Sequence, residues 1–144
     1  MKDKALLNLD SKPLIMQLLL RLRKSRKMDD IILCTTTLPE DQLLVKIASE
    51  NGFKSFAGSE EDVMARFIQA GEKEKADIII RITGDNPLTD PGIIDHMVEE
   101  HIKSDADYTS MDNLPSGITA EVISFPALKK AFRLAEESKN SEYM

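Results

Sequence analysis

The sequence has little cysteine and few aromatic residues: one Cys, no Trp and 5% aromatic residues in 144. A single cysteine excludes a disulfide framework and a cysteine-based zinc site. Its place in a hydrophobic run predicts that Cys34 is a small buried side chain. No hydrophobic run approaches the roughly 18 residues of a membrane span, and the first residues lead into no signal-type core. These absences predict a soluble protein of the reducing cytoplasm, with no membrane partner.

An excess of positive charge is also missing. With 19 Lys and Arg against 25 Asp and Glu, the formal net charge is −6. Sequence-independent nucleic-acid binding needs clustered cations, so we predict no nucleic-acid partner. The one basic cluster, residues 21–27, follows an apolar run, where the C-terminus of a helix favours cations. Neither standard glycine-rich phosphate loop, GxxxxGK[ST] or GxGxxG, is present.

The sequence does contain alternating strand and helix patterns joined by short links. This alternation predicts an α/β protein with right-handed βαβ connections and a mostly parallel sheet, arranged as a three-layer α/β/α sandwich. A length of 144 residues predicts a single domain. The predicted helices begin near residues 14, 37, 59, 90 and 125, and the predicted strands cover residues 30–35, 53–57, 78–82, 107–110 and 121–124.

Several helix ends carry capping signals. Residues 37–40 have the Thr-x-x-Glu spacing of a capping box, and Ser59 is expected to cap the next helix, with Asp62 completing that cap. Asp90 and Pro91 fit the N-cap and first position of the following helix. The sequence therefore gives Asp62 and Asp90 structural explanations that are sufficient on their own.

The stretch 76–91 organises the rest of the chain. Its β-branched run, residues 78–82, predicts a strand buried on both faces, and the turn formers 83–87 end it. Ligands collect at the carboxyl ends of strands in open α/β sheets, so Asp85 lies where a metal or phosphate ligand is expected. One carboxylate with substrate phosphates suits Mg²⁺. The alternative is a turn-forming Asp that bonds its own backbone.

Four further polar residues are candidates for a function. Arg81 lies inside the predicted strand and needs a partner there, either a carboxylate or a ligand phosphate. Arg66, on the helix after Ser59, is by default a surface arginine. His96 and His101 are about 140° apart on a helix, so they predict a surface and a rim histidine rather than a metal pair.

Four motifs then occur in order: residues 4–15, 35–41, 58–67 and 81–91. Together they resemble the cytidylyltransferase family of spore coat polysaccharide biosynthesis proteins, which is related to CMP-KDO and CMP-sialate synthetases. The resemblance covers essentially the whole chain. It implies a glycosyltransferase-A-like nucleotidyltransferase fold. It also implies Mg²⁺-dependent transfer of CMP from CTP to a sugar acceptor, with release of pyrophosphate.

The resemblance also assigns roles to single residues. Asp85 matches the metal-binding and catalytic Asp, and Lys4 matches the catalytic lysine that closes the nucleotide loop. Glu121, in the segment 117–122, is the expected contact of the sugar acceptor. The nucleotide is expected to lie near five side chains: Lys4, Ser59, Asp62, Arg66 and Thr83.

Two features of the family are missing from this sequence: the first strand with its Ser-x-Arg-x-x-x-Lys loop, and a later strand with a second metal-binding Asp. We therefore expect a partial nucleotidyltransferase domain over residues 1–144, truncated at both ends, whose exposed sheet edges favour a homodimer. One alternative is a catalytically inactive fragment, or a degenerate nucleotide-binding or dimerisation module. Another is a phosphoacceptor receiver domain, which predicts an acidic pair after the first strand, and no such pair is visible.

Overall fold

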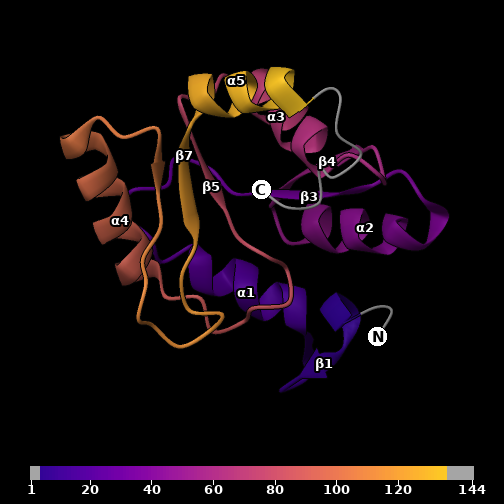
Figure 1. Cartoon of the computed structure of the whole chain (residues 1–144). Coiled ribbons are helices and arrows are strands. Elements are labelled where there is room, and N and C mark those ends of the chain that lie inside the picture. The colour runs from indigo at the N-terminus through magenta and orange to yellow at the C-terminus, as the bar shows by residue number, and fades with distance from the viewer. Residues whose placement is uncertain (1–3, 136–144) are drawn as a thin grey trace. The chain divides into compact units, whose positions relative to one another are not determined.

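The structure is a computed structural model that describes residues 4–135 (Figure 1). The chain divides into two compact units. Unit 1 contains the residues up to Ile31 together with Ile80–Val122, and unit 2 contains Ile32–Ile79 together with the residues from Ile123 onwards. No described helix has the length and apolar character needed to cross a membrane.

Helices and short strands alternate along the described chain (Figure 1). In order, the elements are η1 (Lys4–Leu6), β1 (Asn8–Leu9), β2 (Lys12–Pro13), α1 (Leu14–Leu22), β3 (Ile32–Thr36), η2 (Pro39–Asp41), α2 (Gln42–Glu50), β4 (Lys54–Gly58), α3 (Val63–Glu74), β5 (Ile78–Arg81), α4 (Pro91–Ser104), β6 (Tyr108–Thr109), β7 (Glu121–Ser124) and α5 (Phe125–Ala135).

Unit 1 is built on the two amphipathic helices α1 and α4. The N-cap of α1 is Pro13, as its sequence predicts. At the start of α4, the Asp90 carboxylate accepts hydrogen bonds from the Gly92 and Ile93 amides at 2.8 and 3.1 Å, which confirms the predicted cap. The apolar faces of both helices are buried: Ile15, Met16, Leu18, Leu19 and Leu22 on α1, and Ile94, Met97 and Val98 on α4.

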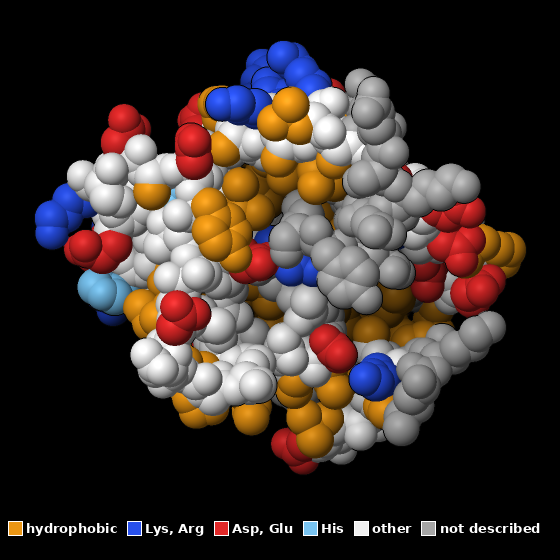
Figure 2. All heavy atoms as spheres, viewed as in Figure 1, with side chains coloured by type: hydrophobic (Ala, Val, Ile, Leu, Met, Phe, Trp, Pro, Cys, Tyr) orange, Lys and Arg blue, Asp and Glu red, His pale blue; other side chains and the backbone are white. Residues whose placement is uncertain are grey.

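Unit 2 contains the parallel strand pair β3 and β4. Their register runs from Ile32 opposite Lys54 to Thr36 opposite Gly58, and α2 and α3 each contact both strands. Helices α3 and α5 pack together, as Figure 1 shows at the top of the view. Their core cluster consists of Met64, Ile68, Ile123, Phe125 and Leu128. On the opposite side of α5, Lys and Arg side chains gather at the surface (Figure 2).

The sheets confirm the predicted α/β class but differ from a single, mostly parallel sheet. The described residues form three small sheets: the antiparallel pair β1-β2, the parallel pair β3-β4, and a three-stranded sheet of order β5-β7-β6. The strand predicted to be buried on both faces is also different. All four residues of β5 are partly exposed, and the strand ends at Arg81.

The C-terminal half of α4 differs from the sequence prediction. Ile102 is 61% exposed although it is apolar, whereas His101, predicted to lie at the rim, is buried. The His101 Nδ1 atom lies 2.8 Å from the Thr109 hydroxyl, and this bond satisfies the buried ring. Burial lowers the pKa of His101, although the charges of Asp107 and Asp105 act in the opposite direction. His96 is exposed, as predicted.

The predicted capping box at residues 37–40 is also wrong. Residues Pro39–Asp41 form a 3₁₀ turn, and α2 begins only at Gln42. The Asp41 carboxylate instead accepts hydrogen bonds from the Thr36 amide at 3.1 Å and the Thr36 hydroxyl at 2.5 Å. A proline in the middle of the motif favours this tight turn, since its ring fixes φ near the helical value.

Candidate functional site

The turn after β5 brings Lys4 and Asp85 together in unit 1. Lys4 Nζ lies 3.7 Å from Asp85 Oδ2, and the two side chains are 52% and 46% exposed. The structure thus pairs the two residues to which the resemblance assigns catalytic roles. Because both ends of the pair are half open to solvent, each can exchange its partner for a ligand at little cost.

Bonds of Thr83 and Asn86 close this turn. The Asn86 amide donates to the Thr83 carbonyl at 3.2 Å, and the Asn86 side-chain amide donates to the Thr83 hydroxyl at 2.5 Å. Within the described chain, the Asp85 carboxylate takes no part in these bonds, and its contact is with Lys4. The turn therefore does not use the Asp85 carboxylate in its own hydrogen bonds, contrary to the alternative of a turn-forming Asp.

A buried threonine anchors the second half of the turn. Thr89 is 0% exposed, and its hydroxyl lies 2.9 Å from the Asn86 carbonyl and 3.2 Å from the Gly117 carbonyl. The Asp90 amide adds a bond to the Ile118 carbonyl at 2.9 Å. Gly117 has φ +84°, and a Cβ there would lie 2.9 Å from Asn86 Oδ1, so only glycine fits this contact. These bonds fix the backbone that carries Asp85.

Arg81 has a carboxylate partner, one of the two kinds that its place in the strand predicts. Its Nη1 atom lies 2.5 Å from Glu121 Oε2, and the Tyr108 hydroxyl donates to Glu121 Oε1 at 2.9 Å. Burial raises the pKa of Tyr108, and the hydrogen bond to Glu121 and the charge of Glu121 raise it further. Glu121 thus holds two protein partners, and its contact with a sugar stays a prediction.

In unit 2, the polar residues after β4 form a local network. The N-cap of α3 is Asp62 rather than Ser59: the Asp62 carboxylate accepts from the Ala65 amide at 2.8 Å. Ser59 has a different part, since its hydroxyl accepts from the Asp62 amide at 3.1 Å. The helix therefore begins at Val63, later than predicted, because its cap is Asp62 and not Ser59.

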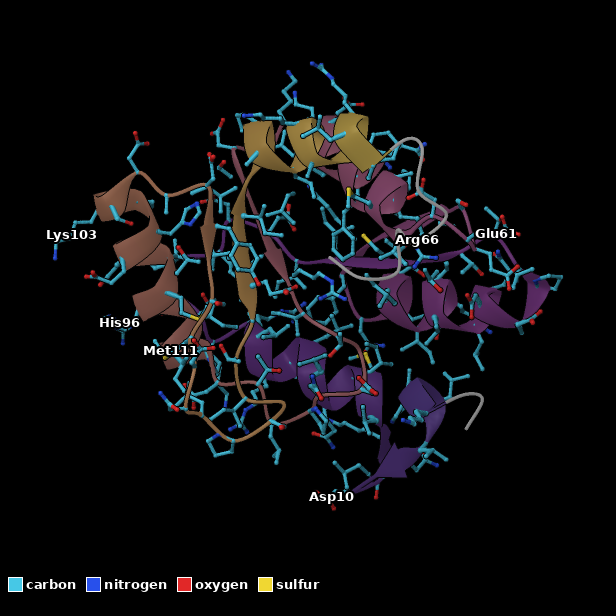
Figure 3. All side chains as sticks on the ribbon, viewed as in Figure 1. Asp10, Glu61, Arg66, His96, Lys103 and Met111 are labelled. Carbon is cyan, nitrogen blue, oxygen red and sulfur yellow. The ribbon has the colours of Figure 1, made fainter. Side chains whose placement is uncertain are left out.

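Arg66, labelled in Figure 3, is not an ordinary surface arginine. Its Nη1 atom donates to the Ser59 carbonyl at 2.7 Å. Its Nε atom is buried and has no partner among the described residues. Gly58 makes this position possible, because a Cβ there would lie 2.8 Å from Arg66 Cγ. A buried donor without a partner is costly, which sets Arg66 apart from a fully solvated arginine.

The charge of Arg66 acts on two neighbours in unit 2. It helps to lower the pKa of Asp41, together with hydrogen bonds from Thr36 and Thr35, against the opposing effect of burial. Burial raises the pKa of Cys34 to about 11, while Arg66 lowers it in part. Asp41 carries no signal in the sequence, because its contact with Thr36 depends on the turn between them.

The donor set is compatible with Mg²⁺ only as part of a larger site. Within residues 4–135, no group of three or more His, Cys, Asp or Glu side chains could hold a metal ion. Asp85 offers one half-exposed carboxylate. Mg²⁺ commonly takes one or two protein carboxylates and completes its coordination with substrate phosphates and water, so the chemistry of Asp85 fits one ligand of such an ion.

Sequence comparison finds relatives over the whole chain. A family model described as cytidylyltransferase matches residues 1–144. The chain is 43% identical over 144 residues to the uncharacterized protein MJ1063 of Methanocaldococcus jannaschii, covering 100% of this chain and 59% of that protein. It is 38% identical over 124 residues to the spore coat polysaccharide biosynthesis protein SpsF of Bacillus subtilis, covering 83% of this chain and 52% of SpsF.

Two solved structures have a similar fold. A cytidylyltransferase from Leptospira borgpetersenii matches with a TM-score of 0.83 and 26% identity, over 96% of this chain and 65% of that one. CMP:2-keto-3-deoxy-manno-octonic acid synthetase, in complex with CTP, matches with a TM-score of 0.75 and 14% identity, over 99% of this chain and 76% of that one. The chain thus spans little more than half of the curated relatives MJ1063 and SpsF.

Proposed function

We propose a function from the premise that this chain belongs to the cytidylyltransferase family: it forms part of an enzyme that transfers CMP from CTP to a sugar and releases pyrophosphate. The solved relative that holds CTP supports the choice of nucleotide. The likeness to SpsF supports a sugar destined for a spore coat or other surface polysaccharide.

The observation that carries the proposal is the half-exposed Lys4–Asp85 pair on a turn that hydrogen bonds close. In this reaction a sugar oxygen attacks the α-phosphorus of CTP, the bond from that phosphorus to the pyrophosphate oxygen breaks, and negative charge moves onto the pyrophosphate. Such transfers depend mainly on positioning and electrostatic stabilisation. Lys4 supplies a positive charge that offsets the charge on the leaving group.

Asp85 is the residue that would hold Mg²⁺ in this site. When bound, the ion neutralises phosphate charge and orients the triphosphate. Before the nucleotide arrives, Lys4 balances the Asp85 carboxylate at 3.7 Å. The bonds of Thr83 and Asn86 keep the turn in place, so its geometry does not depend on that ion pair.

In unit 2, taken by itself, Arg66 is proposed as a contact for a nucleotide. Arg66 offers a guanidinium whose charge and terminal nitrogens suit a phosphate oxygen. The Ser59 carbonyl already orients this guanidinium. We further propose that Glu121, held by Arg81, contacts the sugar acceptor through the oxygen that faces Tyr108.

The test is a thermal melt of the 144-residue chain with Mg²⁺ and each of CTP, ATP and GTP. A ligand that binds only the folded state stabilises it by about 2.7 kcal/mol at a hundred times its Kd. We expect CTP to give the largest shift, and Asp85→Asn to remove the Mg²⁺-dependent part of it. Asp112→Asn, which removes an exposed carboxylate elsewhere in unit 1, is the matched control.

Two results would contradict these assignments separately. Equal shifts with all three nucleotides would exclude a preference for CTP. A Mg²⁺-dependent shift that survives in Asp85→Asn would exclude the metal role of Asp85.

A second candidate function is a nucleotide-binding module that does not transfer CMP. It is favoured by the engagement of Glu121, whose carboxylate already bonds Arg81 and Tyr108. Pyrophosphate release in the presence of CTP and a sugar acid separates the two candidates. Release supports the transferase, whereas CTP binding without release supports the binding module.

A further inference from the structure

A cavity of about 600 Å³ lies in unit 1. It is lined by Arg21, Lys24 and Arg26 from the end of α1 and the segment after it, and by Asp95 and His96 on α4. Lys4 and Asp85 are not part of its lining. We propose that this cavity is a second anion site, which binds a phosphate-bearing ligand.

One acidic residue of the lining, Asp95, already has several protein partners. Asp95 accepts hydrogen bonds from the Ser25 hydroxyl at 2.5 Å, from the Arg26 amide at 3.0 and 3.1 Å, and from the Lys27 amide at 3.2 Å. These bonds outweigh the effect of burial and lower the pKa of Asp95. The Asp95 carboxylate therefore stabilises the loop 25–27, and its oxygens already accept hydrogen bonds from protein donors.

The two other acidic side chains of the lining also have protein partners. Asp90 caps α4 by accepting from the Gly92 and Ile93 amides. Glu99 forms an ion pair with Lys27 at 2.9 Å. The three carboxylates of the lining balance the three cationic side chains. Because Lys27 pairs with Glu99 at the edge of the cavity, one positive charge of the lining remains for a ligand.

The cationic side chains, in contrast, keep their donors available. Arg21 donates from Nε to the Thr89 carbonyl at 3.0 Å, which fixes the guanidinium and leaves its two terminal nitrogens for a ligand. Among the described residues, neither Lys24 nor Arg26 forms an ion pair with a carboxylate. His96 projects outward from α4 in Figure 3 and adds a ring nitrogen to the same lining.

The donors and the size of the cavity suit a phosphate group with a small organic remainder. Arginine forks bind two phosphate oxygens at once, and lysine adds a point charge, so two arginines and a lysine can satisfy all oxygens of a phosphate. A volume of about 600 Å³ also lies in the range of small-molecule sites. A phosphate ester or a diphosphate is therefore the class of ligand that fits.

The test is an NMR titration of the ¹⁵N-labelled 144-residue chain with inorganic phosphate at low salt, without nucleotide. We expect the amide signals of Arg26, Gly92 and Asp95 to shift. The double variant Lys24→Gln/Arg26→Gln should raise the Kd about tenfold. Both side chains are exposed, and the amide spectrum reports directly whether the variant is folded.

Two matched variants make the outcome decisive. Lys73→Gln/Lys130→Gln removes two exposed cations of unit 2 and should leave the Kd unchanged. Asp85→Asn should also leave it unchanged, which separates this site from the proposed nucleotide site. An equal loss of affinity in the Lys73/Lys130 variant would show general charge attraction only, and shifts confined to residues 83–86 would place phosphate at the Asp85 turn. Either result overturns the proposal.

Discussion

Asp85 in unit 1 and Asp41 in unit 2 both lie shortly after a strand, yet their surroundings differ. Each follows the carboxyl end of a strand, β5 for Asp85 and β3 for Asp41. Asp85 has one half-exposed contact with Lys4 at 3.7 Å. Asp41 accepts two hydrogen bonds from Thr36. The same residue type in the same topological position is thus half open to solvent in one unit and bonded to its own strand in the other.

The largest expected effect is a difference in the free energy of unfolding between variants of these two residues. Asp41→Ala leaves the Thr36 amide and hydroxyl without their partner, and we expect it to lower the free energy of unfolding by about 2 kcal/mol. Asp85→Ala removes only an exposed ion pair, so its cost should stay under about 0.5 kcal/mol. Urea denaturation measures both, with the exposed neighbour Glu40→Ala as control. Equal losses in the Asp41 and Asp85 variants would contradict the comparison.

The pH dependence of stability should show the same difference. Burial alone would raise the pKa of Asp41, but hydrogen bonds from Thr36 and Thr35 and the charge of Arg66 hold it below its usual value. The folded state therefore binds this proton less tightly than the unfolded chain. The contribution of Asp41 is present above the unfolded pKa of about 4, and it is lost as the pH falls through the folded pKa.

Denaturation of the wild type and Asp41→Asn between pH 2.5 and 7 checks this dependence. We expect the gap between the two free energies of unfolding to narrow as the pH falls below about 4. A gap that stays constant over this range would show that Asp41 has an ordinary pKa in the folded state.

A smaller effect is expected at the N-cap of α3. Asp62→Ala should cost about 1 kcal/mol, because the Ala65 amide loses its acceptor. Asp62→Asn keeps a capping oxygen and should restore most of that loss. Ser59→Ala should cost less than Asp62→Ala, since Ser59 only accepts from the Asp62 amide. If urea denaturation showed a larger loss for Ser59→Ala than for Asp62→Ala, Ser59 would be the cap, as the sequence predicts.

Where local chemistry alone decides the structure, the sequence was sufficient. The cap at Asp90, the strand Glu121–Ser124 and the class of the fold are confirmed, because each follows from capping or from hydrophobic patterning. The family resemblance is confirmed as well, since four ordered motifs carry it.

The differences arise where tertiary contacts decide. Nothing local shows that His101 will be buried against Thr109, or that Arg81 will find its carboxylate on β7. The position of the α3 cap also depended on a choice between Ser59 and Asp62 that capping patterns alone leave open. The roles of Lys4, Asp85, Thr83 and Glu121 toward ligands stay predictions.

The smallest expected effect is on the Lys4 side of the open pair. Lys4 is 52% exposed and lies 3.7 Å from Asp85, so Lys4→Gln should change the free energy of unfolding by less than about 0.5 kcal/mol. The same variant should weaken CTP-induced stabilisation, because the triphosphate loses a cation while the fold loses almost nothing. Thermal melts with and without CTP measure both quantities, and Lys12→Gln on β2 removes an exposed charge as a control. If Lys4→Gln instead destabilised the free protein and left the CTP shift intact, Lys4 would serve the fold, and the contrast between Asp85 and Asp41 would be lost.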